Sequence, residues 1–218
     1  MGIKICLIGA GSATFSLDLI KDLCITPNLK GSEICLMDIN QERLDTAYEI
    51  CNRYADEVGA TLDITKTTDR VAALQGADHV INCALATGPG WVRLQKGWDI
   101  AKKYGYRFGG SLHIMHDEAF WINFYQLQLM ESILKDILLY CPNAWYIIVS
   151  NPVQAGVTYL TNKYPNARIV GMCNGSSCIY KVADIMGLNR EDISYEMSGI
   201  NHFIWLTKFE YKGLDAFP

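Results

Sequence analysis

The chain has 218 residues, of which 50% are hydrophobic and 19% charged. This length and composition allow one full core and exclude a disordered chain, a collagen-like repeat and a disulfide-stabilised miniprotein. The 19 Lys and Arg residues stand against 23 Asp and Glu, a net charge of −4, and no basic cluster occurs. We therefore expect no nucleic-acid partner and no anionic membrane partner.

The cysteine content indicates the compartment. Most of the eight cysteines lie inside apolar runs, and none forms a Cys-x-x-Cys pair. These cysteines are expected to be reduced and mostly buried, as in a cytoplasmic protein. No uninterrupted apolar segment approaches the ~20 residues that a membrane-spanning helix needs, so we also expect no membrane span.

Strand-like and helix-like periods alternate along the chain. Strands are predicted over 3–8, 33–39, 63–67, 79–84 and 144–149. Helices are predicted over 15–24, 40–58 and 120–139, with a short helical turn over 69–75. The segments 157–163, 169–172, 177–186 and 204–211 continue the series, and the last of them is strand-like. This alternation predicts an α/β fold with a parallel sheet and helices on both faces.

A glycine-rich loop joins the first predicted strand to the first helix. Its sequence is Gly9-Ala10-Gly11-Ser12-Ala13-Thr14. Such a loop presents backbone N–H groups and a helix N-terminus to a pyrophosphate, although Thr14 replaces the third glycine of the usual pattern. The alternative is an ordinary tight turn between a strand and a helix.

Asp38, at the end of the second predicted strand, strengthens the nucleotide interpretation. Its carboxylate would accept hydrogen bonds from ribose hydroxyls and repel a 2′-phosphate, which favours NAD over NADP. The sequence therefore predicts a Rossmann-like, doubly wound sheet that binds NAD through Gly9, Gly11, Ser12, Ala13 and Asp38.

Two further segments follow strands at the same predicted edge of the sheet. Cys83 and Ala84 end the strand that normally flanks the nicotinamide ribose, and Asn151 and Pro152 follow a later strand. Ligands gather at this edge in open α/β sheets. A plain Asn-Pro turn is the alternative at the second position.

Six segments are distinctive when taken together: the glycine loop, 36–38, 104–107, 151–152, 171–175 and 199–206. Gly-Met-Cys-Asn-Gly at 171–175 and Gly-Ile-Asn-His-Phe at 199–203 are the most specific of them. On these segments the chain resembles glycoside hydrolase family 4, the NAD- and manganese-dependent glycosidases. The α-glucosidase and α-glucuronidase branch is the most similar. This resemblance implies that the chain is the N-terminal half of a longer enzyme.

The resemblance also implies a metal site and a substrate site. Cys173 and His202 would bind Mn²⁺ or another divalent metal, leaving open positions for sugar hydroxyls. Asn151 would hydrogen-bond the sugar, and Asn201 would either do the same or orient His202. By the same resemblance, the sugar is oxidised at carbon 3, loses a proton from carbon 2, eliminates the leaving group and then adds water.

The acid and the base are not assigned by the resemblance. Relatives carry His or Asp directly after the metal cysteine, whereas this chain has Asn174, which cannot donate as an acid. Asn174 and Asp117 are the candidate catalytic residues, although Asp117 is equally interpreted with His116 as a helix N-cap. The main base is expected beyond residue 218.

The predicted organisation is an NAD-binding domain over 1–184, followed over 185–218 by the beginning of an α+β catalytic and oligomerisation domain. The predicted function is hydrolysis of α-glycosides of unphosphorylated hexoses or hexuronic acids, in a homo-oligomer (a dimer or a tetramer). Two alternatives remain at this point: a 2-hydroxyacid dehydrogenase of the lactate/malate type, and an NAD-binding module without turnover.

Overall fold

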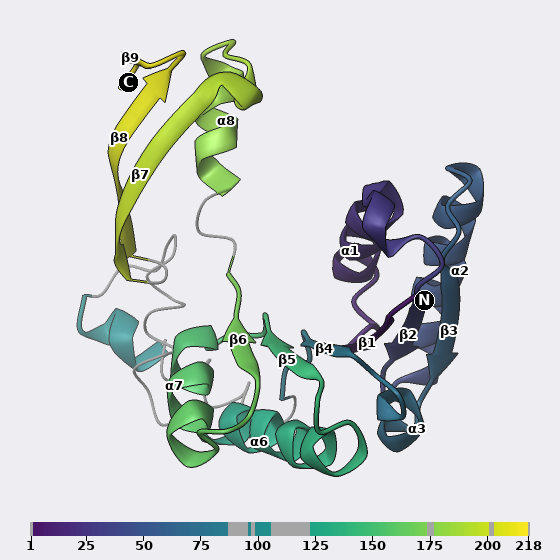
Figure 1. The fold of residues 1–218 in the computed structure, drawn as a ribbon. Coiled ribbons are helices and arrows are strands. Elements are labelled where there is room, and N and C mark those ends of the chain that lie inside the picture. Colours follow the sequence, from purple (N-terminus) through teal and green to yellow (C-terminus); the bar gives the residue numbers. More distant parts are fainter. Residues whose placement is uncertain are drawn as a thin grey trace. The chain divides into compact units, whose positions relative to one another are not determined.

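The computed structural model describes residues 2–86, 96, 99–105, 123–173, 177–200 and 203–217 (Figure 1). The chain divides into two compact units, Met1–Gln95 with Trp121–Met172 and Lys96–Phe120 with Cys173–Pro218. Each unit has its own sheet and its own buried core.

The first unit is built on a six-stranded sheet in the order β3-β2-β1-β4-β5-β6. Its strands are β1 (Lys4–Ile8), β2 (Glu33–Met37), β3 (Asp63–Thr67), β4 (His79–Asn82), β5 (Trp145–Ile148) and β6 (Ile169–Gly171). Its helices are α1 (Ala13–Ile25), the 3-10 helix η1 (Pro27–Leu29), α2 (Gln41–Glu57), α3 (Arg70–Leu74), α6 (Asn123–Tyr140) and α7 (Val153–Lys163). Every strand pair is parallel, and the strand order reverses between β1 and β4. The predicted Rossmann-like sheet is thereby confirmed.

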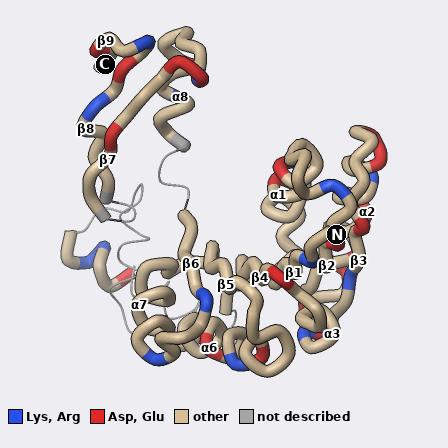
Figure 2. Tube along the Cα trace, viewed as in Figure 1, with Lys and Arg blue, Asp and Glu red and all other residues tan. Residues whose placement is uncertain are grey.

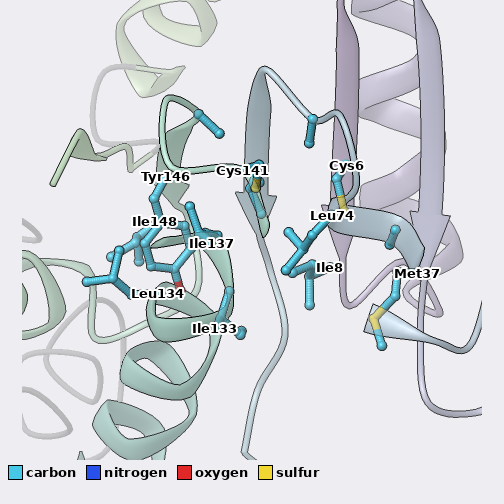
Figure 3. Close-up of a cluster of buried hydrophobic side chains, with 14 of the residues drawn as sticks. Cys6, Ile8, Met37, Leu74, Ile133, Leu134, Ile137, Cys141, Tyr146 and Ile148 are labelled. Carbon is cyan, nitrogen blue, oxygen red and sulfur yellow. The ribbon is translucent and has the colours of Figure 1, made fainter. Parts of the chain in front are cut away.

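Helices cover both faces of this sheet because successive strand residues point to opposite sides. In β1, Cys6 and Ile8 face one core while Ile5 and Leu7 face the other. The core that contains Cys6 is closed by α3 and α6 (Figure 3), and Leu160 of α7 also belongs to it. The core that contains Leu7 is closed by α1 and α2. Near-continuous apolar strands are the sequence signature of this arrangement.

Helix α7 begins four residues before the predicted segment 157–163. Val153 and Gly156 are buried in the added turn. A Cβ atom at Gly156 would come within 2.5 Å of the Met130 sulfur of α6. Glycine weakens a helical pattern in the sequence, but here it allows α6 and α7 to pack closely.

The second unit contains α8 (Ser177–Ile185), the 3-10 helix η2 (Arg190–Asp192) and an antiparallel sheet of β7 (Ile193–Ile200), β8 (Phe203–Tyr211) and β9 (Leu214–Asp215). Ile179 and Ala183 of α8 are buried together with Phe209 of β8. The strand-like segment predicted over 204–211 is confirmed as part of β8, which pairs with β7. The functional division at residue 184 stays a prediction, although α8 packs within the second unit.

Charged side chains are distributed without strong segregation, whereas the cysteines are mostly buried. Figure 2 shows Lys and Arg interspersed with Asp and Glu along the helices and strands that the structure describes. Six of the eight cysteines are buried or partly buried, and none is in a disulfide. Among the described residues, no helix is both long and apolar enough to cross a membrane.

A charged cluster ties α6 to α7. The side chain of Glu131, on α6, accepts hydrogen bonds from the hydroxyls of Tyr159 at 2.6 Å and Tyr164 at 2.7 Å. The ammonium groups of Lys135 and Lys163 each lie 3.0 Å from the same carboxylate. These donors hold the pKa of Glu131 well below its usual range, the two tyrosine hydroxyls having the largest effect.

We expect Glu131→Gln to lower the free energy of unfolding by about 1–3 kcal/mol at pH 7, because hydrogen bonds to a charged group are lost. A depressed carboxylate pKa contributes stability above the unfolded value of about 4.3 and loses it as the pH falls towards the folded value. The difference between wild type and variant should therefore shrink below about pH 4. Urea unfolding at several pH values measures it, and a difference independent of pH would contradict the assignment.

Candidate functional site

The glycine loop lies between the carboxyl ends of β2 and β4. The N–H groups of Gly9 and Ala10 both donate to the carbonyl of Met37, at 2.9 and 3.0 Å. Gly9 has a φ of +93°, and a Cβ atom there would lie 2.5 Å from the backbone nitrogen of Ala84. Only glycine fits this conformation and this close approach without strain.

Gly11 and Asp38 are in direct contact. The N–H of Gly11 donates to Oδ2 of Asp38 at 2.8 Å, and the N–H of Asn40 donates to Oδ1 at 2.9 Å. A Cβ atom at Gly11 would lie 2.7 Å from Oδ2. Because each carboxylate oxygen has two acceptor sites, both oxygens can still accept from a ligand hydroxyl. The structure thus brings together two residues that the sequence assigns to one site.

The N-terminus of α1 follows directly after Gly11, which contacts Asp38. Ser12 is the N-cap, its side chain makes no capping hydrogen bond, and its carbonyl accepts the first helical bond from Ser16. The three N–H groups from Ala13 to Phe15 precede that first bond, so they are available to an anion. The Ser16 hydroxyl donates to the carbonyl of Ala10 at 2.8 Å and so anchors the loop from inside.

Cys83, the residue directly after β4, supports the glycine loop. Its Sγ lies 3.3 Å from the carbonyl oxygen of Ile8 and 3.2 Å from that of Gly9. Burial, with an added contribution from the nearby Asp38 carboxylate, raises the pKa of the Cys83 thiol to about 12. The thiol is therefore protonated at neutral pH, and its single hydrogen is shared between these two carbonyls. A direct contact between Cys83 and a cofactor stays a prediction.

Two buried amide side chains that the sequence analysis did not single out hold the end of β4. Oδ1 of Asn82 accepts from the N–H of Ala84 at 3.0 Å, and Nδ2 donates to the Tyr146 hydroxyl at 2.8 Å. Gln126 of α6 contacts the carbonyl of Ala84 and the N–H of Ala86. A polar residue on the apolar stripe of the predicted helix is the signal that points to Gln126.

Asn151 lies three residues after Ile148, the last residue of β5. A cis peptide bond joins it to Pro152. The N–H groups of Val149 and Ser150 both donate to the carbonyl of Asn82 at 3.0 Å, so this loop is attached to the end of β4. Within the described residues, Oδ1 of Asn151 is buried without a hydrogen-bond partner. An unpaired buried acceptor is costly, and a hydroxyl donor from a ligand would satisfy it.

The predicted metal and catalytic residues are only partly described. Cys173 is exposed and follows the end of β6 by two residues. His202, Asn201, Asn174 and Asp117 lie outside the described residues. The described part of the chain holds no group of three or more His, Cys, Asp or Glu side chains suited to a metal ion. The pair of Cys173 and His202 therefore stays a prediction.

The strand order and the glycine loop define a Rossmann-like α/β protein, with its candidate site at the carboxyl ends of β1, β2, β4 and β5. Solved structures share this fold. The structure of a 6-phospho-α-glucosidase from gut microorganisms, in complex with NAD and Mn²⁺, matches with a TM-score of 0.75 at 22% identity, over 98% of this chain and 48% of that one.

Sequence comparison identifies the family. The model of the family described as family 4 glycosyl hydrolase matches residues 4–188. The chain is 29% identical to an α-galactosidase of Bacillus subtilis (strain 168), over 99% of this chain and 49% of that protein. It is 30% identical to an α-galacturonidase of Thermoanaerobacter italicus, over 100% of this chain and 48% of that protein.

This chain therefore belongs to family 4 of the glycosyl hydrolases, as its resemblance predicted. It spans about half the length of the curated relatives that it matches. Family membership argues against the lactate/malate-type dehydrogenase, although a malate dehydrogenase and a lactate dehydrogenase of Cryptosporidium parvum share the fold, each with a TM-score of 0.67.

Proposed function

We propose that the whole protein is a glycosidase that requires NAD and a divalent metal and hydrolyses α-glycosides of unphosphorylated hexoses or hexuronic acids. The observation that carries the proposal is the 2.8 Å contact between the N–H of Gly11 and Asp38, in a chain that belongs to family 4. The names of the α-galactosidase and the α-galacturonidase support an unphosphorylated hexose or hexuronide.

The residues at the edge of the first sheet fit NAD. Gly9 and Gly11 leave no side chain between the loop and a pyrophosphate, and a Cβ atom at either glycine would collide with its neighbours. The N–H groups at the N-terminus of α1 would bind the pyrophosphate, and the Asp38 carboxylate would accept hydrogen bonds from the ribose hydroxyls. When bound, NAD supplies a reversible hydride acceptor. The Asp38 carboxylate would disfavour a 2′-phosphate.

Cys173 and His202 would hold the metal, which when bound supplies a Lewis acid for the sugar oxygens. The exposed position of Cys173 fits a thiolate that a metal ion can reach. Asn151, with its unpaired buried oxygen, would accept a hydrogen bond from a sugar hydroxyl. Asn201 would bind sugar or orient His202. Asn174 and Asp117 stay the candidate catalytic residues, and of the two only the Asp117 carboxyl group could transfer a proton. Assembly as a homo-oligomer belongs to the same proposal.

The experiment uses the full-length protein and a panel of nitrophenyl glycosides, with and without NAD and Mn²⁺ under reducing conditions. We expect hydrolysis of an α-hexoside or α-hexuronide only when both cofactors are present. Turnover in D₂O should leave deuterium at carbon 2 of the released sugar, measured by NMR, and NADH should not accumulate.

Each alternative function predicts a different result in this assay. A dehydrogenase would accumulate NADH in proportion to product. An NAD-binding module without turnover would release no nitrophenol from any member of the panel. Hydrolysis without deuterium at carbon 2 would exclude the elimination route, and preference for a 6-phosphorylated sugar would correct the substrate class.

A further inference from the structure

The side chain of Gln126 forms a three-point contact at the carboxyl end of β4. Its Oε1 accepts from the N–H of Ala86 at 2.7 Å, and its Nε2 donates to the carbonyl of Ala84 at 3.0 Å. The same Nε2 lies 3.4 Å from the Ser150 hydroxyl, in the loop after β5. One amide therefore connects α6 to two neighbouring strand ends.

The position of Gln126 on α6 makes this contact unusual. Gln126 is 7% exposed, and it lies on the stripe that continues through Met130 and Ile133 into the core below the sheet. Burying an amide in an apolar stripe costs stability unless its hydrogen bonds are made. Its partners are two backbone groups that flank Leu85, a residue that is 59% exposed. The contact thus fixes the backbone of a segment that is itself exposed.

The order of the strands shows which part of a bound dinucleotide this segment would meet. Asp38 follows β2, the glycine loop follows β1, and Ala84 follows β4, and these strands are adjacent in the order β2-β1-β4. With the adenosine ribose at Asp38 and the pyrophosphate at the glycine loop, the next part of NAD lies over the ends of β4 and β5. Gln126 holds those two ends and makes no contact with the loop or with Asp38 that the structure describes.

We propose that Gln126 is a positioning residue for the nicotinamide half of NAD. It holds the 84–86 segment and the Ser150 loop in the arrangement that receives the nicotinamide ribose, and it contributes little to the adenosine half. The inference rests on the proposed NAD-dependent function. It adds that different residues position the adenosine half and the nicotinamide half of the cofactor. The amide acts through the backbone of Ala84 and Ala86, so its side chain need not touch the cofactor.

The test compares two ligands in the full-length protein. ADP probes the adenosine and pyrophosphate half, and NADH probes the whole dinucleotide; both affinities are measured by calorimetry, and NADH also by its fluorescence. Gln126→Leu should weaken NADH binding by about tenfold or more, because two backbone groups lose their partner, while ADP affinity changes by less than about twofold. Gln128→Leu is the matched control, since Gln128 is an exposed residue on the same helix.

Gln126→Glu serves as the second variant if the leucine variant does not fold. An ionised glutamate accepts from the N–H of Ala86 but cannot donate to Ala84, so the same loss of NADH affinity with unchanged ADP affinity is expected. Equal losses for both ligands, or no loss for either, would overturn the positioning role. Wild-type protein that binds neither ligand would instead overturn the proposed NAD-dependent function.

Discussion

Replacing Cys173 with serine is expected to reduce metal-dependent hydrolysis by at least about 100-fold, because a Lewis acid supplies several kcal/mol of transition-state stabilisation. A serine hydroxyl is a weaker ligand than a thiolate and stays protonated at neutral pH. The kcat/KM for the best glycoside of the panel, measured over a range of Mn²⁺ concentrations with the full-length protein, checks this. Full activity at the same Mn²⁺ requirement would show that Cys173 is not a ligand.

Cys178→Ser is the matched control for this change. Cys178 is also exposed, five positions further along and within α8, and its replacement should leave the Mn²⁺ dependence unchanged. Oxidation offers a second measurement, because Cys173 is accessible and the thiolate is the form that binds a metal. Mild peroxide should abolish Mn²⁺ binding by the wild type, and dithiothreitol should restore it if only a sulfenic acid or a disulfide has formed.

Asp38→Ala is expected to weaken NAD binding by about 1–3 kcal/mol, or roughly 5- to 150-fold, the cost of losing charge-assisted hydrogen bonds. The loss has two sources. The ribose hydroxyls lose an acceptor, and the N–H groups of Gly11 and Asn40, now at 2.8 and 2.9 Å from the carboxylate, lose their partner. Titration calorimetry measures the affinity, and an unchanged value would remove Asp38 from the site.

Asp45→Ala controls for the loss of an acidic side chain in the same unit. Asp45 lies on α2 and pairs with Lys66, away from the glycine loop, so NAD affinity should stay within about twofold. Asp38→Asn separates charge from hydrogen bonding. The variant keeps an acceptor oxygen for the N–H of Gly11 but no longer repels a 2′-phosphate, so the preference for NAD over NADP should fall.

Much of the fold follows from local patterns. The helix predicted over 40–58 forms as Gln41–Glu57, because Leu44, Ala47, Cys51 and Ala55 recur at helical spacing and the Asn40 side chain caps the first turn. The strands predicted over 3–8 and 33–39 form as Lys4–Ile8 and Glu33–Met37, because apolar residues fill both faces of a buried parallel sheet. Similarly, the glycine loop after the first strand and Asp38 at the end of the second belong to a motif that already indicates one site.

What the sequence by itself determined is the class of the fold, the family and the residues of the nucleotide loop. Periodicity and motif spacing report which side chains are buried and which backbone positions need glycine, and these properties are local. Tertiary structure alone decided the partners of those residues. Cys83 meets the carbonyl of Gly9 across 74 positions, and Gln126 meets Ala84 across 42. A polar residue within a buried stripe of the sequence is expected to need hydrogen bonds. Only the packing of α6 against β4 and β5 determines which groups supply them.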